Sequence, residues 1–207
     1  MADDAVEVLT IGHSTLPYER FLVLLRNAGV TAIADVRTAP YSRHFPQYNR
    51  DTLKNELRFD GISYVFLGNE LGGRPNDRKL YRDGVADYEK MATVDAFDKG
   101  LQRVVEGAKK FRIALMCSEH DPADCHRCLL VSRALANKGI RVNHILSDGA
   151  VASQGQIEDR LLELAGRKSE DLFAPREERL AAAYKDRAQK VAFAEPQSAP
   201  QDRIAAE

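Results

Sequence analysis

The sequence of 207 residues has no apolar stretch that approaches the length of a membrane span. Its first residues, Met1–Glu7, are acidic and contain no apolar segment of signal-peptide length. We therefore expect a cytoplasmic protein without membrane contact. The formal net charge is −1, which excludes a global basic footprint for nucleic acid while leaving room for a local basic patch.

Two nucleotide-binding signatures are also missing, since neither a Walker loop nor a dinucleotide fingerprint occurs. The sequence thus gives no sign of an NAD site or of a P-loop ATP site. Cysteine is scarce: there are three, and all of them lie between Cys117 and Cys128. An odd number in so short a stretch is not a secreted disulfide framework, and clustered Cys and His favour a metal site or catalysis.

Short apolar runs alternate with helical patterns along the chain. This order predicts an α/β fold with a mostly parallel central sheet of about five strands and helices on both faces. The predicted strands are Val6–Ile11, Val30–Val36, Ile62–Leu67, Ile113–Cys117 and Ile140–Leu146. One predicted helix begins at Pro17 and another lies within Tyr88–Phe111. The other predicted helices span Asp51–Phe59, Pro122–Lys138 and Gln154–Leu164.

Residues 1–166 are expected to form a single α/β domain. Residues 167–194 are charged and Ala-rich, and we predict a C-terminal helical arm that packs on the domain or on a second subunit, which would make a homodimer. Its candidate anchors are Leu172, Phe173, Leu180 and Tyr184. Residues 195–207 are polar, hold two prolines, and are expected to form a disordered tail.

Polar side chains gather where the predicted strands end. In a parallel sheet the carboxyl ends of the strands share one edge, so these groups should converge there. The alternative is that strand ends are polar only because they lead into loops. The residues concerned are His13 and Ser14, Asp35 and Arg37, Arg74, and Cys117 with Glu119.

Five blocks occur in a characteristic order: Thr10-Ile-Gly-His-Ser14, Asp35-Val-Arg37, Pro40-Tyr-Ser-Arg43, Leu71-Gly-Gly-Arg74 and Cys117-Ser-Glu119 with Cys125-His-Arg127. Together they resemble the motifs of domain-of-unknown-function family 488. The resemblance covers about Val8 to Val191. It implies an α/β domain and a bacterial or archaeal cytoplasmic protein, and it brings no established activity. Cys128 and His120 fall outside the family's pattern.

The stretch Cys117–Cys128 supports a nucleophilic cysteine. Cys117 ends a strand and should face the start of a helix, whose dipole and free N–H groups favour a thiolate. His126 or His13 would serve as base, with Glu119 as acid or orienting group, and Cys125 should point towards Cys117. The guanidinium group of arginine can donate two parallel hydrogen bonds to a phosphate or carboxylate, so we expect a small anionic, nucleotide-like ligand. The candidate ligand-binding residues are Ser14, Asp35, Arg37, Arg43, Arg74 and Arg127.

A metal-binding or nucleic-acid-binding module built on the same residues is the alternative. One arrangement uses Cys117, His120, Cys125 and Cys128, although only four residues separate the two pairs. A looser site uses Cys117, Cys125 and His126, with or without His13. A third interpretation is that the cysteines are simply small buried residues. The sequence does not decide between a metal cofactor and none.

Overall fold

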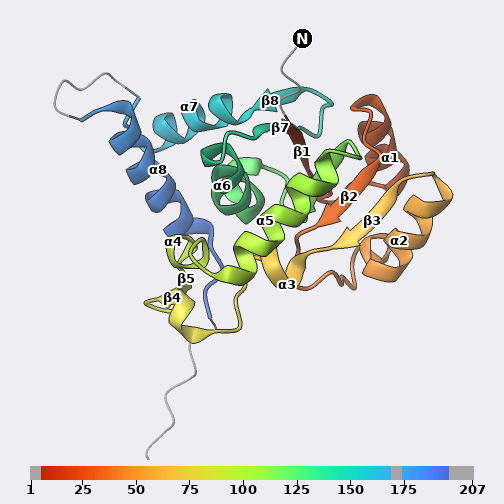
Figure 1. The fold of residues 1–207 in the computed structure, drawn as a ribbon, viewed down its shortest axis with the longest axis horizontal. Coiled ribbons are helices and arrows are strands. Elements are labelled where there is room, and N and C mark those ends of the chain that lie inside the picture. Colours follow the sequence, from red (N-terminus) through yellow and green to blue (C-terminus); the bar gives the residue numbers. More distant parts are fainter. Residues whose placement is uncertain (1–5, 169–173, 196–207) are drawn as a thin grey trace, which may run out of the picture.

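The structure is a computed structural model that describes residues 6–168 and 174–195 (Figure 1). Its central sheet has six strands in the order β3-β2-β6-β1-β7-β8. All neighbours pair in parallel except β7 and β8, which are antiparallel. The α/β prediction is confirmed, with one edge strand more than expected. The strands are β1 (Glu7–Gly12), β2 (Ala32–Asp35), β3 (Ser63–Phe66), β6 (Ile113–Cys117), β7 (Arg141–Ile145) and β8 (Val151–Ser153).

Helices connect the strands, and a two-stranded hairpin of β4 (Tyr81–Arg82) and β5 (Val85–Ala86) interrupts the run between β3 and β6. The α-helices are α1 (Tyr18–Asn27), α2 (Arg50–Phe59), α3 (Gly68–Leu71), α4 (Tyr88–Met91), α5 (Asp95–Ala108), α6 (Arg133–Asn137), α7 (Gln154–Leu164) and α8 (Arg176–Val191). The tighter 3₁₀ turns are η1 (Pro46–Tyr48), η2 (Arg78–Leu80) and η3 (Pro122–Asp124), and η4 (Arg127–Ser132) is π-helical.

Successive side chains of a strand point to opposite faces, so the apolar strands supply two cores. Leu9 and Ile11 of β1 belong to a core with residues of α1 and α2, whereas Val8 belongs to the core under α5 and α7. Each such side chain contributes about 1.5–3 kcal/mol by burial. Covering both faces leaves the carboxyl edge of the sheet as the place where loops meet.

The predicted continuous helix over Pro122–Lys138 is wrong. Asp121 caps a 3₁₀ turn through its side chain and Pro122 begins that turn, as expected of a helix start. The turn ends at Cys125, whose backbone is extended at φ −131° and ψ 138°. Helical structure resumes only with η4 and α6. The chain therefore opens at Cys125, which frees its side chain to turn towards the end of β6.

The predicted C-terminal arm contains α8, which packs against α7 and η3. Tyr184 is buried and Leu180 packs against the core, whereas Leu172 and Phe173 lie outside the described residues, as does the predicted tail beyond Glu195. After α8 the backbone joins the β4–β5 hairpin, since Ala86 N–H donates to the carbonyl of Phe193 at 2.9 Å. The end of the arm is thus bound to the hairpin by main-chain hydrogen bonds.

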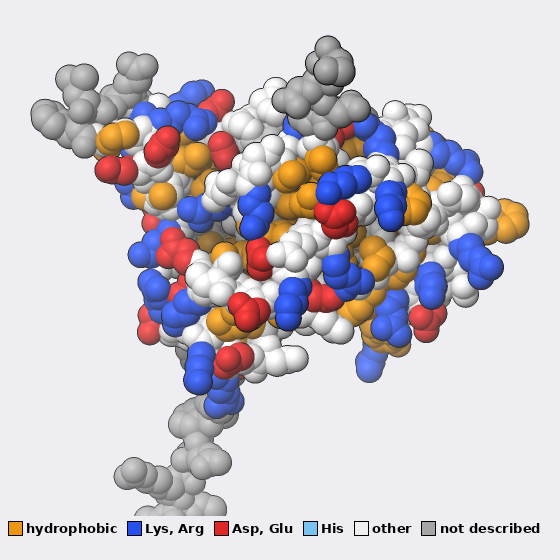
Figure 2. Space-filling view, in the orientation of Figure 1, with side chains coloured by type: hydrophobic (Ala, Val, Ile, Leu, Met, Phe, Trp, Pro, Cys, Tyr) orange, Lys and Arg blue, Asp and Glu red, His pale blue; other side chains and the backbone are white. Residues whose placement is uncertain are grey.

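Figure 2 shows Lys and Arg side chains interspersed with Asp and Glu on one face of the molecule. This mixture agrees with the small net charge. Within residues 6–168 and 174–195, none of the helices combines the length and apolar character that crossing a bilayer requires.

Candidate functional site

The end of β6 lies at the middle of the sheet's carboxyl edge. Cys117 pairs with Gly12 at the end of β1, and the preceding Met116 pairs with Asp35 at the end of β2. The backbone of the next loop stays close, because a Cβ on Gly12 would lie 1.9 Å from the carbonyl oxygen of Glu119. Only glycine at this position permits so close an approach, which keeps Glu119 beside the end of β6.

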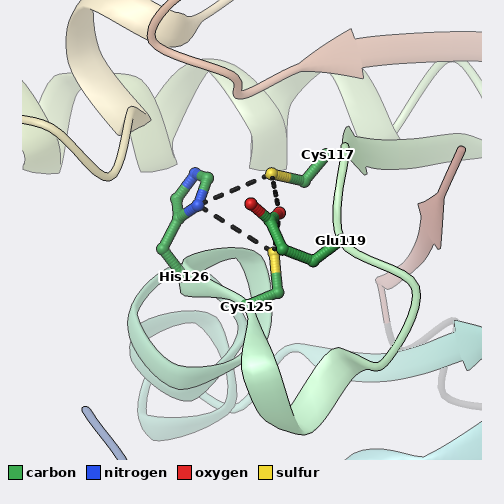
Figure 3. A group of neighbouring side chains, drawn as sticks. All are labelled: Cys117, Glu119, Cys125 and His126. Carbon is green, nitrogen blue, oxygen red and sulfur yellow. Dashed lines mark hydrogen bonds between the residues drawn. The ribbon is translucent and has the colours of Figure 1, made fainter. Parts of the chain in front are cut away.

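Four side chains converge at this point: Cys117, Glu119, Cys125 and His126 (Figure 3). Their ligand atoms all lie within 4.8 Å of one another. Glu119 Oε2 is 2.7 Å from Cys117 Sγ and 3.0 Å from Cys125 Sγ. His126 Nδ1 is 3.5 Å and 3.9 Å from the same two sulfurs. We call these four residues the thiol cluster.

The orientation of His126 follows from its second nitrogen. Nε2 lies 2.9 Å from the carbonyl oxygen of Val36, which can only accept a hydrogen bond, so Nε2 carries the proton. In the neutral ring Nδ1 is then an unprotonated lone pair that faces both sulfurs. The ring also rests on Gly73, where a Cβ would lie 2.7 Å from His126 Cγ. Burial on its own lowers the pKa of His126, but the hydrogen bond with Cys125 and its charge outweigh burial and raise the pKa. Nδ1 is therefore held towards the thiols, as an acceptor in the neutral ring and as a donor to the Cys125 thiolate in the protonated ring.

The two thiols differ in their surroundings. Burial on its own raises the pKa of Cys125, but the hydrogen bond with Cys117 and the positive charge of Arg127 outweigh it, and the pKa is well below its usual value. Burial raises the pKa of Cys117. For Glu119, burial followed by the charge of Cys125 raises the pKa. Negative charge in the cluster is therefore best held on Cys125, whose Sγ also accepts the Arg127 N–H at 3.4 Å.

Asp35, Arg37 and His13 form a second buried group next to the thiol cluster. Arg37 donates through Nε and Nη2 to the carboxylate of Asp35, at 2.9 and 2.7 Å, and through Nη1 to His13 Nε2 at 3.2 Å. His13 Nδ1 donates to the carbonyl of Ser14. Burial, followed by the charge of Arg37, lowers the pKa of His13 to about 4. His13 is thus a neutral partner of Arg37 and not a member of the thiol cluster.

A pocket of about 120 Å³ opens beside the cluster. Cys117, Glu119 and His126 form one wall, and Arg37 and Arg74 supply positive charge. The Arg74 guanidinium stacks 4.7 Å from the Phe193 ring centroid. The remaining lining comes from several loops: Thr38, Ala39, Gly73, Tyr88, Ser118, Asp124, Val191 and Phe193. The C-terminal arm therefore closes one side of the pocket, which the sequence did not indicate.

Four other residues that the sequence singled out lie outside this pocket. Ser14 donates its backbone N–H to the carbonyl of Ser118, and Arg43 is exposed on the loop after β2. His120 pairs with Ser147 at 2.6 Å. Cys128 Sγ lies 4.0 Å from His144 Nε2 and 3.8 Å from Gln154 Oε1, and it does not belong to the thiol cluster. The expected ligand set that used His120 and Cys128 is therefore not assembled.

Tyr88, Phe193 and Gly73 are the site residues that sequence reasoning missed. Gly73 belongs to the Leu71-Gly-Gly-Arg74 block and lies against His126, whereas Gly72 lies against Gly68 and Thr38. No pattern marked Tyr88 or Phe193, because each reaches the pocket only through the fold.

The fold and the site together define the class of protein, which is an open α/β protein with a central polar site. Its sheet is mostly parallel, and buried thiols, a carboxylate and an imidazole lie at the carboxyl edge. Comparison of the sequence with families places it more narrowly. The family described as Domain of unknown function DUF488 matches residues 17–134, more than half of the chain, and the chain belongs to that family. Comparison with curated proteins and with solved structures gives no match.

Proposed function

We propose that this protein is a metal-dependent enzyme that acts on a small anionic molecule. Cys117, Cys125 and His126 hold a zinc-like ion, and Glu119 moves protons beside it. The observation that carries the proposal is the convergence of two thiols, a carboxylate and an oriented imidazole within 4.8 Å. Cys and His are the donors that zinc prefers.

The distances favour three ligands and not four. A tetrahedral ion with bonds of about 2.3 Å to sulfur and about 2.05 Å to nitrogen puts those two atoms about 3.5 Å apart. The separations between His126 Nδ1 and the sulfurs, 3.5 and 3.9 Å, match this value. Sulfur and oxygen ligands of one ion would be about 3.6 Å apart by the same geometry. Glu119 Oε2 is closer to both sulfurs, at hydrogen-bond distance.

Three protein ligands leave a coordination position open, which is typical of catalytic and not structural zinc. The three proposed ligands are buried, and Glu119 is the least buried member of the cluster and lines the pocket. The Val36 carbonyl accepts the imidazole proton of Nε2, and metal-binding histidines commonly donate their other ring N–H to such a carbonyl. A ligand in the pocket would meet the metal position, Glu119 and two arginines.

Metal analysis of untagged protein tests the proposal. We expect about one transition-metal ion per chain in the wild type, and at least a tenfold loss of affinity in Cys117→Ser and Cys125→Ser, because each removes a ligand. Cys128→Ser is the matched control. The Cys128 thiol lies three residues after Cys125 in the chain but contacts Gln154, so this substitution should leave the metal in place. Glu119→Gln should also retain it, because Glu119 is not a ligand.

Wild-type protein that neither contains nor takes up zinc or cobalt would overturn the proposal. Equal loss of metal in Cys128→Ser and Cys117→Ser, with both variants folded, would do the same, because the loss would not depend on the proposed ligand. Far-ultraviolet circular dichroism shows whether each variant is folded.

The second candidate is a metal-free thiol enzyme, as the sequence first indicated. Two observations favour it: Cys117 lines the pocket, and the Arg127 backbone N–H supports negative charge on Cys125. On this hypothesis iodoacetamide should modify Cys117 or Cys125 in chelator-treated protein at pH values well below the free-cysteine pKa of about 8.5. Modification only above that pH, at the rate found for denatured protein, contradicts it.

The anionic ligand is proposed here from the arginines of the pocket. Nucleic-acid binding, a homodimer through the arm and a cytoplasmic location stay predictions from the sequence.

A further inference from the structure

Tyr88 has a hydroxyl group that no residue in the described part of the chain engages. The side chain is 7% exposed, at the start of α4. Among the described residues nothing forms a hydrogen bond with its hydroxyl, although most other tyrosines of the core have one. A hydroxyl without a hydrogen bond inside the protein takes its partner from solvent or from a ligand.

Tyr88 lines the pocket that Cys117, Glu119 and His126 also line, and it borders two further pockets. Burial, followed by the charges that Cys125 and Glu119 can carry, raises the pKa of Tyr88. Its oxygen is not among the fully enclosed polar atoms without partners, so it can be reached from outside the protein. Its hydrogen-bond partner is then water or a molecule that displaces that water from the pocket.

We propose that Tyr88 donates a hydrogen bond to an oxyanion of the bound ligand, and that this pocket is an oxyanion site of the carboxylate or phosphate type. The inference rests on the proposed function for the position of the metal. Near neutral pH the phenol is protonated, so it approaches an anion as a donor.

Other groups of the pocket agree with an oxyanion. Arg37 has five N–H groups, of which Asp35, His13 and the Tyr48 carbonyl engage four, which leaves one on Nη1. The Arg74 guanidinium is held over Phe193 and adds a second positive charge at the rim. A volume of about 120 Å³ is below the range of about 300 Å³ and more that drug-sized ligands occupy. The pocket therefore fits a small anionic group.

Titration of inorganic phosphate and of acetate into the purified full-length protein, followed by calorimetry, tests the inference. We expect the wild type to bind one of the two probes, and Tyr88→Phe to bind it about 10- to 100-fold more weakly, the usual effect of losing a hydrogen bond to a charged group. Phosphate and acetate distinguish the two kinds of oxyanion. Tyr18→Phe is the control, because its hydroxyl bonds to Asp60 outside the pocket.

A stability measurement separates this role from a structural one. Tyr88→Phe removes no hydrogen bond within the protein, so its free energy of unfolding should equal or exceed that of the wild type. Weaker anion binding together with unchanged stability supports the inference. Equal affinity in wild type and Tyr88→Phe overturns it, as does a wild type that binds neither probe.

The metal content of the same samples keeps the two proposals apart. Tyr88-dependent binding in a protein without metal would overturn the metal centre and leave the oxyanion site standing. If the protein contains metal but its anion affinity is the same in wild type and Tyr88→Phe, the oxyanion site is overturned and the metal centre stands.

Discussion

Arg127 shows at the scale of one residue how the charges of the site balance. The side chain is fully buried, and its Nη1 and Nη2 donate to the carbonyls of Glu119 and His120. Within the described part of the chain its Nε has no partner and no carboxylate pairs with it. An uncompensated buried cation is expensive. Two thiolates, a dication and the Glu119 carboxylate sum to −1 and would compensate it.

Gly73 is the residue on which the imidazole position depends. In Gly73→Ala the new Cβ would lie 2.7 Å from His126 Cγ, closer than such atoms approach. The ring must then shift, which disturbs its distances to the sulfurs and to the Val36 carbonyl. We expect about a 10- to 100-fold loss of metal affinity, the range seen when support of a metal ligand is disturbed. Competition with a chromophoric chelator measures it.

Gly155→Ala provides the comparison for this substitution. It lies in the first turn of α7, and the nearest atom to its added Cβ is Ser153 Oγ at 3.8 Å. It should keep wild-type metal affinity and gain up to about 1 kcal/mol of helix stability. Unchanged metal affinity in Gly73→Ala would show that the contact with His126 does not position the ring.

The identity of the chemical groups was largely predictable, since Cys117, Glu119, Cys125 and His126 were all candidates from the sequence. Their mutual arrangement was not. His13 was as good a candidate base as His126 from the sequence alone, whereas the fold pairs it with Arg37. Tyr88 enters the pocket from a segment between two strands, and a single tyrosine carries no periodic signal that points to a site.

At the scale of elements, the segment after β6 shows where local rules end. Asp121 and Pro122 correctly predicted the start of a helical turn. Propensity then favoured continuing it, but Cys125 is extended and η4 is π-helical, with Ser132 donating to the Arg127 carbonyl at 2.7 Å. Tertiary contacts of the thiol and of buried Arg127 outweigh local preference here. π-Helical turns of this kind often occur at functional sites.

Small edge elements escaped prediction for a different reason. The strand β8 has three residues, and β4 and β5 have two each, so no period-two pattern develops. The antiparallel register of Asn143 with Ser153 and the bridge from Val85 to Ala194 join segments by main-chain hydrogen bonds. Such bonds depend little on side-chain identity. The long apolar strands and the helix Gln154–Leu164, by contrast, were predicted well because their burial patterns are regular.

At the scale of the whole molecule, one buried chain of hydrogen bonds ties the sheet to the C-terminal arm. Thr10 Oγ1 lies 2.8 Å from His144 Nδ1, and His144 Nε2 lies 2.8 Å from Gln154 Oε1. Gln154 Nε2 donates to the Tyr184 hydroxyl at 2.6 Å, which donates to Glu158 at 3.0 Å. The chain links β1, β7, α7 and α8, and α8 leads to the residues that close the pocket.

Tyr184→Phe therefore tests whether arm and domain unfold together. The change leaves the buried Gln154 amide without the Tyr184 hydroxyl as acceptor, which lowers the free energy of unfolding by about 1–3 kcal/mol. For a protein of this size, each kcal/mol lowers Tm by about 2–4 °C. Because the chain of bonds is continuous, calorimetry should show a single transition that moves as a whole. Combining it with Gln154→Leu should cost less than the sum of the two single changes, since both interrupt one network. An early separate loss of helix in Tyr184→Phe, with the main transition unmoved, would mean that the arm is an independent unit and that the pocket wall it supplies opens without unfolding the sheet.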